Sequence, residues 1–68
     1  MSENITDKTE LEVIGFLQDA WIELREAIKV DDKPRMEKAY GQVGTFAIVL
    51  CSAYGHAPEE IELLLVDI

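Results

Sequence analysis

Two interruptions, at residues 31–34 and 55–58, constrain the fold of this chain more than any other feature. Proline disfavours helical geometry at the residue before it and suits the first turn of a helix, whereas glycine commonly ends one. The interruptions leave three segments, of about residues 8–29, 34–54 and 58–67, with apolar residues at helical spacing. We therefore predict one small all-α domain over residues 1–68. Its first two helices should form an antiparallel hairpin, and a short third helix should follow.

The first segment has a clear amphipathic pattern. Asp7 stands where an N-cap belongs, and Glu10 follows at the spacing of a capping box. The apolar residues fall within an arc of roughly 120°, while the acidic residues lie opposite. The predicted buried arc contains Val13, Ile14, Leu17, Ala20, Trp21, Leu24 and Ile28, with Phe16 and Ala27 at its edge. We expect Glu12, Asp19, Glu23, Glu26 and Lys29 to face solvent.

The second segment is apolar on more than one side, so more than one neighbour must cover it. Its mid-helix glycines each cost about 1 kcal/mol relative to alanine, which indicates close packing against another backbone. The apolar surface of the chain exceeds what one hairpin can bury, and we predict a homodimeric helical bundle. A groove for a different protein is the alternative. The residues assigned to this packing are Leu11, Ile22, Gly41, Gly44, Ile48 and Cys51.

The charge is strongly acidic and unevenly distributed. The chain has 14 acidic and 6 basic residues and a net charge of −8. Residues 20–38 hold five acids and five bases, so the whole net charge comes from the flanking segments. A hairpin brings these acidic segments together, which favours a protein partner with a basic surface and disfavours direct nucleic-acid binding. The alternative is that the acids only keep a small apolar protein soluble.

The sequence contains no pattern typical of catalysis or metal binding. One cysteine and one histidine exclude an internal disulfide and a structural zinc site. Cys51 and His56 are five residues apart, beyond the spacing that places side chains on one helix face. His56, Glu59 and Glu60 span a predicted helix junction, which argues against a metal site. We expect a non-enzymatic protein without a cofactor.

Membrane insertion and export are also disfavoured. Residues 1–8 are polar and acidic, unlike a signal peptide. The uncharged stretch 39–58 contains several polar residues, and its strongly apolar part is shorter than the roughly 20 residues of a span. We predict a cytoplasmic protein with no membrane contact.

These features predict a small acidic protein-interaction module. It would act as a cytosolic regulator or inhibitor of a larger protein, and inhibitors of the kind that phages encode are included in this class. The predicted contact residues are Tyr40, Tyr54, Glu59, Glu60, Glu62, Leu63 and Val66. One alternative is a helical dimer that binds or sequesters a small ligand beside Tyr40 and the two glycines, with Arg35 or Lys38 meeting an anionic group. Another is an acidic nucleic-acid mimic that blocks a DNA-binding protein. No motif assigns the chain to a family.

Overall fold

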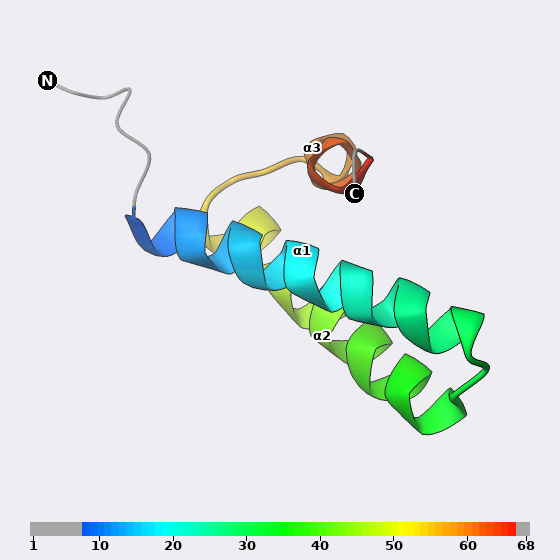
Figure 1. Cartoon of the computed structure of the whole chain (residues 1–68). Coiled ribbons are helices and arrows are strands. Elements are labelled where there is room, and N and C mark those ends of the chain that lie inside the picture. Colours follow the sequence, from blue (N-terminus) through cyan, green and yellow to red (C-terminus); the bar gives the residue numbers. More distant parts are fainter. Residues whose placement is uncertain (1–7, 67–68) are drawn as a thin grey trace, which may run out of the picture.

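The structure is a computed structural model that describes residues 8–66. Its described part contains three helices and no strand, which confirms the all-α prediction. The helices are α1 (Lys8–Lys29), α2 (Lys33–Ala53) and α3 (Pro58–Leu65). Figure 1 shows α2 returning alongside α1, with α3 seen nearly end-on as it crosses them. The predicted N-cap Asp7 and the expected end of the third helix at residue 67 lie outside the described residues.

A Schellman motif closes α1 and leads directly into α2. The backbone N–H of Asp32 donates to Ala27 O at 3.0 Å, and that of Asp31 donates to Ile28 O at 3.1 Å. Asp31 occupies the left-handed position of the motif, with φ 54°. Asp32 then caps α2, because its carboxylate accepts a hydrogen bond of 3.3 Å from the backbone N–H of Arg35. This short connection turns the chain back, so that α2 packs on α1.

The connection between α2 and α3 depends on a second left-handed residue. Gly55 has φ 73°, and the N–H of His56 after it donates to Leu50 O at 3.1 Å. At the start of α3, the carboxylate of Glu60 accepts a hydrogen bond of 2.6 Å from the backbone N–H of Ala57. Alanine has no side-chain acceptor, so only this half of a capping box forms.

The main core draws one residue from each helix. Leu17 of α1 and Leu50 of α2 are fully buried, and Ile61 of α3 is 8% exposed. Gln18 reinforces this packing, since its side-chain amide donates to Leu64 O at 3.0 Å. We call the part of α1 and α2 around this cluster the covered half. The partly buried residues packed against the cluster are Val13, Ile14, Val43, Phe46, Ala47, Cys51, Tyr54, Leu64 and Leu65.

Near the connection between α1 and α2, no other element within residues 8–66 forms a third layer over the two helices. The buried side chains there are those of two alanines, Ala27 and Ala39, and of Leu24. We call this part, residues 21–30 and 33–41, the uncovered half. It exists because α3 has only 8 residues and packs at the other end of the pair.

The predicted buried arc of α1 is therefore only partly buried. Ile28 is 57% exposed, Phe16 is 53% exposed and Trp21 is only half-buried. Helical spacing identifies which residues share a side of α1, but burial also requires a neighbour long enough to reach them. None of the described helices combines the length and apolar composition that crossing a membrane requires.

Candidate functional site

An apolar groove occupies the uncovered half between α1 and α2. It has a volume of about 620 Å³, and Glu37 is the one charged residue in its lining. Tyr40 stands at its edge with 72% of its surface exposed. The remaining residues that line the groove are Trp21, Leu24, Ile28, Met36 and Gly41. Such a contiguous apolar surface is typical of a protein-interaction site.

The groove extends toward α3 through Trp21. The indole also lines a smaller hollow with Glu62, Leu65 and Val66 at the end of α3. Leu63 on α3 and Val66, its C-cap residue, are each 69% exposed. The groove and the outer side of α3 therefore belong to one side of the molecule, which we call the groove face.

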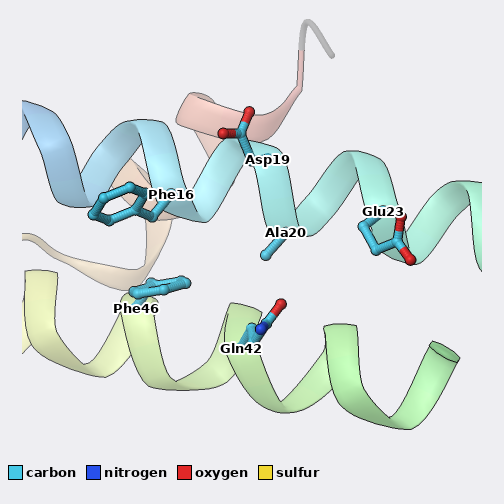
Figure 2. A pocket seen from close by; sticks show the side chains of 6 residues that line it. All are labelled: Phe16, Asp19, Ala20, Glu23, Gln42 and Phe46. Atoms are coloured by element: carbon cyan, nitrogen blue, oxygen red, sulfur yellow. The ribbon is translucent and has the colours of Figure 1, made fainter. Parts of the chain in front are cut away.

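A second, smaller pocket lies between α1 and α2 and has a volume of about 320 Å³. Figure 2 shows Phe16 and Phe46 on facing helices, with Ala20 and Gln42 between the helices beside them. The two ring centroids are 5.8 Å apart, and the rings are tilted by 36°. Asp19 borders this aromatic pocket and is exposed, although its carboxylate points away from α2.

Next to the aromatic pocket, Glu23 and Arg35 form a bidentate ion pair between α1 and α2. Arg35 Nε donates to Glu23 Oε2 at 2.7 Å, and Nη2 donates to Oε1 at 3.0 Å. These hydrogen bonds, assisted by charge attraction, lower the pKa of Glu23 below its ordinary value of 4.5 and raise the pKa of Arg35. The pair neutralises Glu23, which leaves Asp19 as the exposed acid at the pocket.

His56 joins the start of α1 to the connection before α3. Its ring Nε2 donates to Glu10 Oε2 at 2.5 Å, and both side chains are less than one-fifth exposed. The other ring nitrogen, Nδ1, is buried without a hydrogen bond and lies 3.7 Å from Glu60 Oε1. The spacing of Glu10 from Asp7 predicted a capping box. In the structure, the Glu10 side chain instead forms a tertiary contact with His56.

The structure places the predicted contact residues in two different roles. Tyr40, Leu63 and Val66 are exposed on the groove face. Tyr54 instead packs against the core, because it lies on the same side of α2 as Leu50. The acids are Glu59, Glu60 and Glu62, all exposed, and Glu60 also caps the start of α3.

The residues predicted to pack at a second face do not form one cluster. Leu11 and Ile22 are 56% and 45% exposed on α1. Ile48 lines a hollow between α2 and α3 with Cys51, which is half-buried against the core.

The two mid-helix glycines of α2 have no close neighbour that explains them. A Cβ atom built on Gly41 or Gly44 would meet nothing within 4 Å. The close backbone approach expected at these positions is therefore not provided by the described part of the chain.

Sequence reasoning missed the aromatic pocket, the Glu23–Arg35 ion pair and the Glu10–His56 hydrogen bond. Phe16 and Phe46 each lie at the edge of an apolar stripe, and this shared position is the signal that could have paired them. Within residues 8–66, no group of three His, Cys, Asp or Glu side chains is arranged to hold a metal ion. No family model matches the chain, and comparisons with curated proteins and with solved structures found no match.

Proposed function

We propose that this chain is a non-enzymatic protein-interaction module that acts as a cytoplasmic regulator or inhibitor of a larger protein. The aromatic pocket is the surface that receives the larger protein. The observation that carries this proposal is the pair of phenyl rings in one solvent-open pocket, which the exposed acid Asp19 borders.

The chemistry of the pocket favours a basic side chain of the partner. Aromatic rings attract a cation over their faces by about 0.5–2 kcal/mol, and they also pack on the aliphatic stem of lysine or arginine. Glu12 and Asp19 flank Phe16 at i−4 and i+3, so both acids lie on its side of α1. The net charge of −8 would speed the approach of such a partner.

We also propose that the working form is a homodimer of antiparallel helical hairpins, with α3 as a brace. This assembly is supported by the apolar groove and by the exposed Leu63 and Val66, which one chain leaves uncovered. A chain of 68 residues without an internal disulfide has few other ways to gain stability. The larger partner and the second copy would then use different surfaces.

Selection of random peptides displayed on phage, with the purified protein as the target, tests the binding proposal. We expect the enriched peptides to carry arginine or lysine next to an apolar residue. Phe16→Ala should weaken their binding about tenfold, because aromatic anchors dominate interfaces of this type. The matched control is Leu11→Ala, which removes a similarly exposed apolar side chain of α1 outside the pocket.

Two results would contradict the proposal. One is enrichment of peptides without basic residues. The other is an equal loss of affinity in the Phe16→Ala and Leu11→Ala variants. Replacing the arginines of a selected peptide by uncharged citrulline supplies a further check, since the proposed contact depends on the cation and not on side-chain length.

The ligand-binding alternative has weaker support. Its anion-binding residue was to be Arg35 or Lys38, but Arg35 is held by Glu23. The apolar groove that contains Tyr40 and Gly41 has no basic residue in its lining. The nucleic-acid mimic is supported by the net charge alone, and competition by duplex DNA for a selected protein partner would favour it.

A further inference from the structure

We infer that two copies of this chain meet groove face to groove face and run in opposite directions, so that α3 of each copy lies in the groove of the other. The inference rests on the proposed homodimer and adds its contact residues, its direction and the chemistry of its seam. The occupant of the groove is thus a second copy of this chain.

The first argument is that exposed apolar side chains lie beside acids on the side of α3 opposite its core contact. Ile61 faces the covered half and is 8% exposed, whereas Leu63 and Val66 are each 69% exposed. Glu59, Leu63 and Val66 follow the i, i+4, i+7 spacing of one helix stripe, and Ile61 lies on the opposite side. Apolar side chains on two opposite sides of a helix favour a place between two other layers, with the acids at the rim of the second contact. Residues 8–66 of one chain provide only one of these layers.

The second argument is complementary shape. α3 adds a layer over the covered half, while the uncovered half of the same face is hollow. Trp21 lies where the two regions meet, because its indole lines both the groove and the hollow beside α3. Two copies in opposite directions place each α3 over the other copy's groove, with a two-fold axis near Trp21. Two copies in the same direction would press α3 against α3 and leave both grooves empty.

The third argument is charge. Residues 39–66 contain Glu59, Glu60 and Glu62 and no base, whereas residues 20–38 contain equal numbers of acids and bases. Opposite directions bring α3 beside the lysines near the α1–α2 connection, Lys29 and Lys33. Lys29 also lies 3.8 Å from Glu26 of its own chain, and Glu37 is the one acid of the groove that α3 would meet. Opposite directions also keep the two acidic ends apart. Copies in the same direction would place these ends side by side, and like charges repel across an interface.

Gly41 agrees with this arrangement. It lines the groove, and an added Cβ would have open space around it within the chain. A helix-interior glycine is about 1 kcal/mol less favourable than alanine, so its presence suits a place where another backbone approaches closely. In the inferred dimer, that backbone is α3 of the second copy.

The first experiment compares two exposed apolar residues of nearly equal accessibility near the end of α1. Ile28 lines the groove and is 57% exposed, while Val30 is 60% exposed and lies outside the groove lining. Ile28→Glu should raise the dimer dissociation constant about 100-fold, because it buries a carboxylate twice in a two-fold seam. Val30→Glu should leave the constant within about threefold of the wild type. Sedimentation equilibrium measures both constants, and circular dichroism checks that both variants remain helical.

The second experiment tests the direction of the copies by charge reversal. Lys29→Glu with Lys33→Glu, and separately Glu59→Lys with Glu62→Lys, should each weaken the dimer about tenfold or more through like-charge contacts. Glu60 is left intact because it caps α3. A single chain carrying all four substitutions should regain most of the affinity. When the copies run in opposite directions, the glutamates introduced near the α1–α2 connection of one copy face the lysines introduced on α3 of the other. The attraction between opposite charges is then restored.

Three results would overturn the inference. These are a wild-type protein that stays monomeric at every concentration, equal effects of Ile28→Glu and Val30→Glu, and a fourfold variant as weak as the double variants. Failure here is distinguishable from failure of the binding proposal, because basic peptides contact Phe16 on a different surface. If the protein is a monomer and still binds such peptides, the proposed interaction module stands and the proposed dimer is contradicted.

Discussion

The two halves of the α1–α2 pair have similar apolar sequences and very different surroundings. In the covered half, Leu17 and Leu50 are fully enclosed because Ile61 of α3 completes the cluster. In the uncovered half, Ile28 and Tyr40 remain 57% and 72% exposed, since α3 does not reach them. The difference shows that α3 divides one apolar face into a core that stabilises the chain and a groove that is available for assembly.

The largest expected effect comes from truncating the covered half. Leu17→Ala should lower the free energy of unfolding by about 2–5 kcal/mol, because it removes a fully buried side chain and leaves a cavity. The matching change in the uncovered half, Ile28→Ala, should cost less than about 1 kcal/mol at dilutions where the protein is monomeric. Urea denaturation followed by circular dichroism measures both values. Equal losses would mean that the two halves do not differ in the way described.

A smaller effect is expected from releasing α3. His56→Ala removes the hydrogen bond to Glu10, whose side chain is less than one-fifth exposed in the wild type, and leaves that carboxylate without this donor. We expect the free energy of unfolding to fall by about 1–3 kcal/mol. Hydrogen exchange of the α3 amides should speed up relative to the wild type, and by more than that of the α1 amides. His56→Gln retains an N–H donor and should lose less. Unchanged exchange in α3 after His56→Ala would show that this contact does not hold the helix in place.

The glycines of α2 sharpen the comparison, because only one of them lines the groove. Gly41→Ala and Gly44→Ala should each raise the free energy of unfolding of the monomer by about 1 kcal/mol, since both sites have room for a methyl group. Gly41→Ala should also weaken self-association, whereas Gly44→Ala should not. Thermal unfolding and sedimentation equilibrium separate the two effects. A lower free energy of unfolding in either alanine variant would contradict the conclusion that these two sites have room for a methyl group.

The smallest effect is a pH dependence at the ion pair beside the aromatic pocket. The pKa of Glu23 is lowered in the folded chain, so the pair contributes stability above pH 4.5 and loses it as the pH falls through the folded pKa. Glu23→Gln should therefore flatten the acid side of a plot of unfolding free energy against pH. Urea titrations at several pH values below 5 check this, with Glu12→Gln as a control on the exposed side of α1. If the plots of unfolding free energy against pH are identical for Glu23→Gln and the wild type, the ion pair does not contribute to stability in this pH range.

The local parts of the fold could be predicted from the sequence because their signals are local. The segment Asp31–Pro34 ends one helix and begins the next through hydrogen bonds between residues at most five apart. Gly55 ends α2 for the same kind of reason, since its positive φ costs little without a side chain.

The arrangement between helices could not be read in this way. The Glu10–His56 contact joins residues 46 positions apart, and the Phe16–Phe46 pair joins two different helices. Helical spacing assigned Ile28 and Trp21 to the predicted buried arc. Their exposure depends on the position and length of α3, which the spacing on α1 does not contain.

One dilution series tests most directly whether the uncovered half is a seam between copies. Light scattering gives the molar mass, and the emission of Trp21, the single tryptophan of the chain, reports on the groove in the same samples. We predict a mass of twice 7.7 kDa at high concentration, and a red shift of Trp21 emission at the same dilution at which the mass halves. A mass of 7.7 kDa throughout, or emission that does not change when the mass does, would contradict the claim.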